Sequence, residues 1–186
     1  MIIKNGSVFT ARARFEKLDL EIENGRIVRL APAGTLEGED VIDAEGKYVT
    51  PGFVDIHIHG SKGSDFCDAG AEHVETMCAY LGSMGVTSFL GTTMAFDEPI
   101  LSNIFDVAKP YFGKDGYGAV LRGVNMEGPF FSKAKKGAQA EKYIVDPDIG
   151  MFERLFERAE GNIRLVDVAP ELDGAVEFIA EASKKC

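Results

Sequence analysis

Two histidines one residue apart, His57 and His59, lie in the apolar segment 51–60, which reads PGFVDIHIHG. The whole chain contains three histidines, and two of them lie in this one segment. Side chains alternate between the faces of a strand, so Asp55, His57 and His59 would point the same way, and the aliphatic residues between them would point the other way, to pack against helices. Neutral imidazole is the commonest protein ligand for zinc and similar metals. The spacing indicates one side of a metal site. Two hydrogen-bonded histidines at a strand end are the alternative interpretation.

A second polar stretch, RGVNMEGPFF at 122–131, repeats this pattern. Asn125 and Glu127 would share one face of a strand, with Val124 and Met126 on the other face, and a Gly-Pro pair follows where the chain must turn. A carboxylate there could bind a metal, act as a base or cap the next turn. Strands of a parallel barrel present their carboxyl ends at one rim, so we expect Glu127 to share a metal ion with both histidines. Asp55 and Asn125 are expected to support these ligands from behind.

Other polar side chains follow the same strands. The segment KAKKGAQ places Lys133, Lys135 and Lys136 on a loop at the same rim. Such a cationic loop could steer an anionic substrate, although a solvated surface run is the alternative interpretation. Cys67 could be a soft ligand but is a weaker candidate. His73 falls in an expected helix outside the sheet, where we expect a surface or partly buried position.

The elements that would position these residues are strands and helices in alternation from Pro51 onward. Strands are expected at 53–60, 87–93, 119–128 and 163–171, and helices at 71–84, 97–112, 146–160 and 174–186. Asp97 is suited to cap a helix start, and Gly85 to follow a helix end. Such a succession predicts a parallel sheet. A complete eight-unit barrel needs about 250 residues. About half of that number follows Pro51, so the sheet is either a small open one or the front half of a barrel.

The first 50 residues carry a different pattern, that of small antiparallel strands. In LDLEIENGRIVRL, apolar and polar residues alternate up to Asn24 and Gly25, and an Asn-Gly pair is a strong hairpin signal. Such strands need a second layer to cover them. We therefore expect two domains, with boundaries at 1–50 and 51–186.

Composition restricts the function classes. At 45% hydrophobic residues the chain is expected to fold. Lys and Arg number 20 against 30 Asp and Glu, a net charge of −10, so nucleic acid is not an expected partner. No apolar run approaches the roughly 18 residues that would span a membrane, and none near the N-terminus is typical of a signal peptide. The three cysteines form no disulfide or zinc-ribbon pattern, so we expect a cytoplasmic protein.

Four stretches, in this order, carry a resemblance to a known family: PGFVDIHIHG, GSDFCDA, GVTSFLGTT and GVNMEGPFFSKAKKGAQ. Together they resemble the amidohydrolase superfamily and, within it, the N-acetylglucosamine-6-phosphate deacetylase family. The pattern Pro-Gly-Phe-x-Asp-x-His-x-His alone would also fit dihydroorotases, hydantoinases and several deaminases, whereas MEGPF followed by KKGAQ discriminates. The resemblance implies an α/β fold, the first half of a (β/α)8 TIM-type barrel preceded by part of a small β-sandwich.

The resemblance also implies chemistry. Enzymes of this kind hydrolyse the acetamide of N-acetylglucosamine 6-phosphate, in amino sugar metabolism, to glucosamine 6-phosphate and acetate. The resemblance assigns Glu127, His57 and His59 as ligands of a divalent metal. Zinc is expected, with iron, manganese or cobalt as alternatives. Ala138 and Gln139 would contact the sugar. Asn125 and Gln139 stand where many relatives have histidine, which we interpret as subtype variation.

Part of the family's machinery is expected beyond the residues of this chain. The resemblance implies two further histidine ligands, an aspartate general acid/base and a phosphate-binding arginine in a later half, and no histidine follows His73. We therefore expect an N-terminal fragment that is inactive alone and forms a homo-oligomer, a dimer. The alternatives are another amidohydrolase, acting on a cyclic amide or another acetamido sugar, and a non-catalytic half-barrel that serves as a binding or assembly module.

Overall fold

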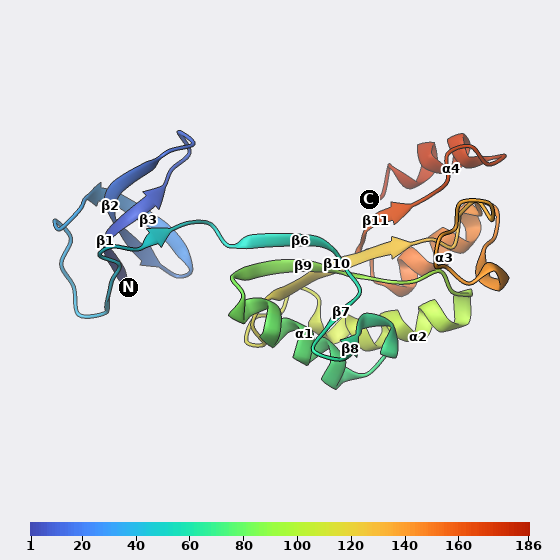
Figure 1. Ribbon diagram of the computed structural model, residues 1–186, viewed down its shortest axis with the longest axis horizontal. Helices are drawn as coiled ribbons and strands as arrows, with labels where there is room; N and C mark the ends of the chain where they lie inside the picture. The colour runs from blue at the N-terminus through green and yellow to red at the C-terminus, as the bar shows by residue number, and fades with distance from the viewer. The chain divides into compact units, whose positions relative to one another are not determined.

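The computed structural model describes residues 1–186 and divides into two compact units, Met1–Pro51 and Gly52–Cys186 (Figure 1). No helix in either unit combines the length and the apolar character needed to cross a membrane.

The first unit is a five-stranded sheet in which β3, β2, β1 and β4 lie in that order and β5 also pairs with β1. Its strands are β1 (Ile2–Phe9), β2 (Phe15–Glu23), β3 (Arg26–Pro32), β4 (Val41–Asp43) and β5 (Tyr48–Val49). The expected hairpin is confirmed, because β2 and β3 are antiparallel and Asn24 and Gly25 between them have φ of 49° and 74°. The positive φ of both residues is what a type I′ turn requires.

One expectation for this unit is wrong, because β4 and β5 run parallel to β1 rather than antiparallel. The cause lies in the connection after β3. Asp19 is buried, and its carboxylate accepts hydrogen bonds from the backbone N–H groups of Gly34, Thr35 and Leu36 at 2.9–3.0 Å. These bonds hold the connection against β2, and the chain re-enters the sheet beside β1 in the same direction.

The second unit is built on a fully parallel four-stranded sheet with the order β11-β10-β9-β6. Its strands are β6 (Phe53–Ile58), β9 (Val86–Thr92), β10 (Val120–Glu127) and β11 (Ile163–Asp167). One helix follows each strand: α1 (Ala71–Ser83), α2 (Glu98–Ala108), α3 (Ile149–Arg158) and α4 (Ala175–Ala182). Two short strands, β7 (Gly60–Ser61) and β8 (Ser64–Asp65), lie between β6 and α1. The predicted strand–helix succession and its parallel sheet are confirmed (Figure 1).

Local capping sets the helix ends. Asp97 accepts a hydrogen bond from Ile100 N at 3.2 Å and begins α2, as expected, and Gly85 follows α1 with a φ of 84°. At the start of α3 the cap is Asp148, which accepts from Met151 N, so this helix begins later than predicted.

The two faces of β10 follow the alternation of its sequence. Val124 and Met126 have no exposed surface and join the core formed with the helices, whereas Asn125 and Glu127 lie on the opposite face. On β6 the expectation that the aliphatic side chains pack against helices is wrong for two of three residues. Val54 and Ile56 are 66% and 57% exposed, because β6 is an edge strand and no helix covers this part of it.

Candidate metal centre

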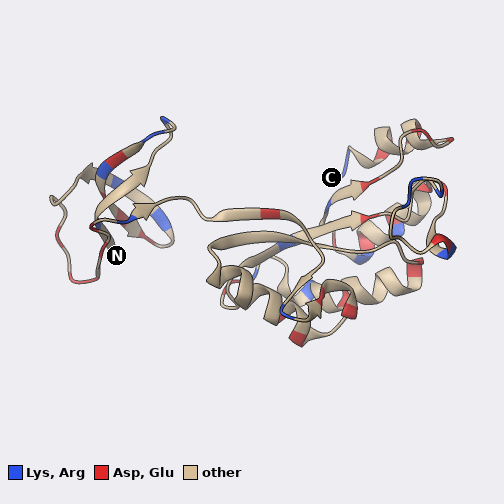
Figure 2. Ribbon diagram, viewed as in Figure 1, with Lys and Arg blue, Asp and Glu red and all other residues tan.

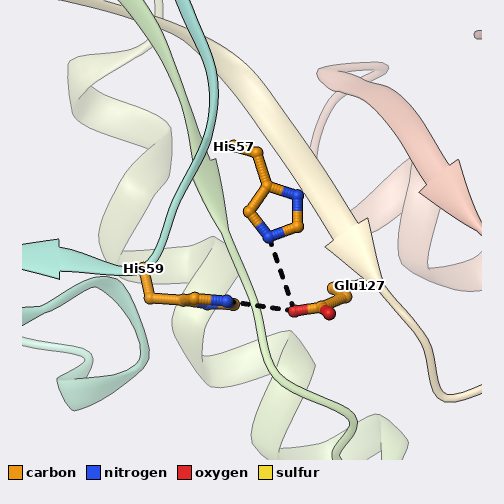
Figure 3. A group of neighbouring side chains, drawn as sticks. All are labelled: His57, His59 and Glu127. Carbon is orange, nitrogen blue, oxygen red and sulfur yellow. Dashed lines mark ion pairs between the residues drawn. The ribbon is translucent and has the colours of Figure 1, made fainter. Parts of the chain in front are cut away.

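The structure brings His57, His59 and Glu127 together at the carboxyl ends of β6 and β10 (Figure 3). The Nε2 atom of His59 lies 3.0 Å from Oε2 of Glu127, and Nε2 of His57 lies 3.8 Å from the same oxygen. The imidazole rings are nearly perpendicular, at 89°, with centroids 5.2 Å apart. The expected meeting of these three side chains is thus observed, although β9 lies between the two strands that carry them.

The end of β9 fixes the orientation of His59. The Nδ1 atom of this imidazole lies 3.2 Å from the carbonyl oxygen of Thr92. Because a carbonyl oxygen can only accept a hydrogen bond, Nδ1 must carry the hydrogen. In the neutral ring, Nε2 then presents a lone pair. The hydroxyl of Thr92 accepts from Ile58 N at 2.9 Å and ties β6 to the same place. A ring nitrogen bonded to a backbone carbonyl is the usual support of a metal-binding histidine.

Glu127 supplies the observation that tests whether these residues fit a cation. Its Oε2 atom is buried and has no hydrogen-bond partner, yet it faces the lone pair of His59 Nε2 at 3.0 Å. Two electron-rich atoms at this distance require a proton or a cation between them. With tetrahedral zinc–ligand bonds of about 2.0–2.2 Å, neighbouring ligand atoms lie roughly 3.3–3.6 Å apart, between the two separations of 3.0 and 3.8 Å found here. Imidazole and carboxylate are ligands that zinc and related divalent metals accept, so the donor set fits such an ion.

The two residues expected behind the ligands have different partners. Asp55 accepts a hydrogen bond from the backbone N of His57 at 3.0 Å, so it supports the strand rather than the imidazole. Asn125 is 2% exposed, and its Nδ2 lies 3.3 Å from the carbonyl of Ile56 and 3.2 Å from Nδ1 of His57. Asn125 therefore makes direct contact with one of the two imidazoles.

A cavity of about 540 Å³ adjoins the centre, bordered on one side by His59 and Glu127 and on the other by the loop after β10. Figure 2 shows basic residues on this loop and acidic residues at the ends of β10 and β11. The exposed Lys135 and Ala138 and the partly buried Lys136 line the cavity. Lys133, on the same loop, lines a different cavity.

Gln139 has a task that the sequence did not reveal. It is 5% exposed, and its Oε1 accepts a hydrogen bond from Ala95 N at 2.9 Å, while its Nε2 lies 3.8 Å from the sulfur of Met94. The Nζ atom of Lys136 in turn donates to the carbonyl of Gln139 at 3.0 Å. Gln139 thus anchors the cationic loop to the segment after β9, and its contact with a sugar stays a prediction.

Two weaker candidates lie outside the metal group. The sulfur of Cys67 accepts a hydrogen bond from Met94 N at 3.3 Å, and burial raises the pKa of the thiol to about 12. A thiol of such a pKa is a poor source of thiolate for a metal. His73 is partly buried, as expected, and its Nδ1 lies 3.2 Å from the hydroxyl of Ser64.

Sequence reasoning missed Asp167, which pairs in register with Glu127 on the neighbouring strand. Burial raises the pKa of Asp167. The charge of His57 lowers this pKa and that of Glu127 raises it, so the Asp167 carboxyl interacts electrostatically with two residues of the centre. The available signal was the one that identified Glu127, a carboxylate at the carboxyl end of a parallel strand.

Comparison with known proteins supports the resemblance that the sequence predicted. The amidohydrolase family model matches residues 40–86, which include the His-x-His strand, and the predicted resemblance to that class is confirmed.

More particularly, the chain is similar to N-acetylglucosamine-6-phosphate deacetylases. It is 35% identical over 177 residues to that of Lysinibacillus sphaericus, an alignment that covers 92% of this chain and 44% of the relative. It is 30% identical to that of Bacillus subtilis over 96% of this chain and 46% of the relative. A variant of the Mycobacterium smegmatis N-acetyl-D-glucosamine-6-phosphate deacetylase, solved in complex with N-acetyl-D-glucosamine-6-phosphate, matches with a TM-score of 0.86 at 26% identity. This match covers 100% of this chain and 47% of that one.

The chain thus spans about half the length of the relatives it matches. Its α/β fold is that of half of a TIM barrel with part of a β-sandwich, as predicted.

Proposed function

We propose that this chain supplies the metal-binding and part of the substrate-binding side of an N-acetylglucosamine-6-phosphate deacetylase. The reaction is hydrolysis of the acetamide to glucosamine 6-phosphate and acetate. The observation that carries the proposal is the buried, unpartnered Oε2 of Glu127 facing His59 Nε2 at 3.0 Å. In this proposal the Met1–Pro51 unit contributes β-sandwich strands, and the Gly52–Cys186 unit contributes the first four β/α units of the barrel.

Each residue of the centre has a task in this proposal. Glu127, His57 and His59 would hold a divalent metal, for which zinc is the first expectation. Such a metal lowers the pKa of bound water and polarises a carbonyl. No side chain of this chain is assigned to proton transfer, so we propose that the 186 residues alone are inactive.

The cavity beside the metal group supports an anionic substrate. Lys135 and Lys136 line it within a protein of net charge −10, so they concentrate positive charge where the overall charge is negative. Lysine ammonium groups bind phosphate by charge-assisted hydrogen bonds. The exposed Ala138 lines the same cavity, and in this proposal it contacts the sugar.

Ligand binding to the chain tests the substrate class. Titration of N-acetylglucosamine 6-phosphate, followed by the amide spectra of the loop, should show tighter binding than N-acetylglucosamine without phosphate, and no binding of a hydantoin. Lys135→Met should weaken the phosphorylated sugar selectively. Lys133→Met is the matched control, since its side chain lines another cavity. Equal binding of both sugars, or preference for the hydantoin, would contradict the proposal.

An acetate-release assay tests the inactivity. We expect no metal-dependent turnover by the 186 residues, and robust turnover would show that the proton-transfer group is present after all. The competing possibility, a non-catalytic half-barrel that assembles with a partner, rests on the two strand edges of β6 and β11. Size-exclusion chromatography of a compact monomer would count against it, and equally against our proposal of a dimer. A cytoplasmic location also stays a prediction.

A further inference from the structure

A second carboxylate, that of Asp167, stands beside Glu127 at the edge of the sheet where the metal group lies. The two residues are register partners on the neighbouring parallel strands β10 and β11, and each is the last residue of its strand. Register partners place their side chains on the same face of a sheet. The carboxyl edge of the sheet therefore carries two adjacent negative charges, as the acidic ends of β10 and β11 in Figure 2 show.

The fold supplies neither of these carboxylates with a cationic side chain. Asp167 is partly buried, and no hydrogen bond contributes to the pKa of its carboxyl. The buried Oε2 of Glu127 has no hydrogen-bond partner and faces the two imidazoles. The helices of the same unit behave differently, since Glu98 of α2 pairs with Arg154 of α3 at 2.8 Å. Two neighbouring carboxylates without an arginine or lysine are thus confined to the carboxyl edge of the sheet.

The charges of the metal group act on Asp167. Burial raises the pKa of its carboxyl, the charge of His57 lowers it, and that of Glu127 raises it. Charges shift the pKa of another group in this way when they lie near it. Asp167 nevertheless lies outside the group of His57, His59 and Glu127, whose ligand atoms are all within 4.8 Å of one another. Its carboxylate is therefore placed to act on a cation in that group through its charge rather than as a ligand.

The sum of charges shows what such an action would do. A divalent cation held by two neutral imidazoles and one carboxylate keeps one uncompensated positive charge, and the carboxylate of Asp167 cancels it. A charge in a partly buried place is costly unless an opposite charge compensates it. Without a cation, the carboxylates of Asp167 and Glu127 repel each other. One residue should therefore destabilise the empty centre and stabilise the occupied one.

We propose that Asp167 is the counter-charge of the metal centre, a residue that strengthens the binding of a divalent cation to His57, His59 and Glu127 without being a ligand. The inference rests on the proposed metal site and adds a residue from a third strand to it. It also gives a task to a carboxylate that the strand-end pattern could have identified in the sequence.

Zinc titration by calorimetry of the 186-residue chain tests the inference. Asp167→Asn keeps the shape of the side chain and removes its charge, so the dissociation constant for zinc should rise about 10-fold at low ionic strength. The difference should shrink as salt is added, because salt screens the charge. Asp167→Glu restores the charge and should recover most of the affinity. Asp167→Ser is a second uncharged variant, which should repeat the loss.

Asp173→Asn is the matched control for the lost charge. Asp173 is exposed and lies in the same connection between β11 and α4, but outside the register with Glu127. Its replacement removes the same negative charge and should change zinc affinity by less than about twofold, because solvent screens exposed charges. An equal loss of affinity in this control would mean that overall charge, rather than the position of Asp167, sets the affinity, and would overturn the inference.

Unfolding in urea separates the counter-charge from a structural role. Without metal, Asp167→Asn should raise the urea midpoint of the second unit, since it removes the repulsion from Glu127, and this rise should vanish in a Glu127→Gln background. With zinc present, the same substitution should reduce the stabilisation that zinc gives. A lower midpoint of the metal-free Asp167→Asn chain, or its failure to fold, would make Asp167 a structural residue and overturn the inference.

The titrations also distinguish this inference from the proposed metal site. If zinc binds the unaltered and the Asp167→Asn chains equally well, the inference is wrong and the metal site stands. If zinc does not bind the unaltered chain, the metal site is wrong, and the inference fails with it.

Discussion

Each of the two units buries at least one carboxylate oxygen, and the two carboxylates have opposite surroundings. Asp19 in the first unit accepts backbone hydrogen bonds from Asn5, Gly34, Thr35 and Leu36, at 2.8–3.0 Å. Glu127 in the second unit leaves its buried Oε2 without a hydrogen-bond partner and aims it at two imidazoles. Hydrogen bonds from the fold use the oxygens of Asp19, whereas the buried oxygen of Glu127 receives none.

We interpret the difference as that between a structural carboxylate, Asp19, and a carboxylate that remains available to a ligand, Glu127. A buried charge whose lone pairs are all used stabilises the chain around it, and nothing remains for a cation. A buried charge left short of partners is costly, and it persists where a bound group compensates it. Four predictions test this contrast, beginning with the largest expected effect.

Replacement of Asp19 by alanine should disrupt the first unit. The change leaves four backbone N–H groups without acceptors, and we expect a loss of roughly 3 kcal/mol or more of that unit's stability. Hydrogen exchange of the Leu36 and Thr35 amides, compared with core amides of β10, measures the loss. Unchanged protection of the loop after β3 would refute the structural role.

Acid should also destabilise the first unit, as the Asp19→Ala substitution is expected to do. Burial raises the pKa of Asp19, but the four backbone donors outweigh burial and hold the pKa below its ordinary value. The stability it contributes is therefore present above about pH 3.9, its unfolded pKa, and is lost as pH falls through the lower, folded pKa. Burial raises the pKa of Asp167 in the second unit, so its contribution has the opposite sign. The test is to lower the pH of the protein and follow amide hydrogen exchange in each unit. Protonation of Asp19 should reduce the protection of amides in the first unit, whereas protonation of Asp167 should not reduce it in the second.

Zinc should stabilise the second unit and leave the first unchanged. At a free concentration tenfold above the dissociation constant, binding adds about 1.4 kcal/mol. Thermal unfolding with and without zinc measures the gain, and Glu127→Gln should abolish it. A gain that survives this substitution would place the cation elsewhere.

The smallest effect is expected from Glu127→Gln without metal. Because Oε2 has no hydrogen-bond partner to lose, unfolding in urea should change by no more than about 1 kcal/mol. A large destabilisation would make Glu127 a structural carboxylate like Asp19, and the contrast between the units would fail.

The sequence was sufficient wherever a residue's environment depends on its own strand. The alternation on β10 correctly placed Val124 and Met126 in the core and Glu127 on the other face. The same reasoning failed for Val54 and Ile56, since their exposure depends on what lies beside an edge strand rather than on the strand's own pattern.

The meeting of His57, His59 and Glu127 could likewise be predicted, because parallel strands end at one edge. The tasks of Gln139 and Asn125 could not. The Gln139 side chain binds the backbone of Ala95, 44 residues away, and Asn125 contacts His57 from 68 residues away. Such partners depend on the register of three strands and on which end of an amide faces which neighbour. Neither the strand register nor the orientation of an amide group can be recognised from a pattern in the sequence.

The anchoring of the cationic loop by Gln139 has a kinetic consequence. The side-chain oxygen of Gln139 accepts a hydrogen bond from Ala95 N, and its backbone carbonyl accepts one from the Lys136 ammonium, so the loop holds its shape before any anion arrives. In the proposed function, an incoming phosphate would then meet charges already in place, and the cost of ordering the loop would not be subtracted from the affinity. Association should follow a single exponential whose rate rises linearly with ligand concentration and falls with added salt, as a diffusional encounter without a closing step requires.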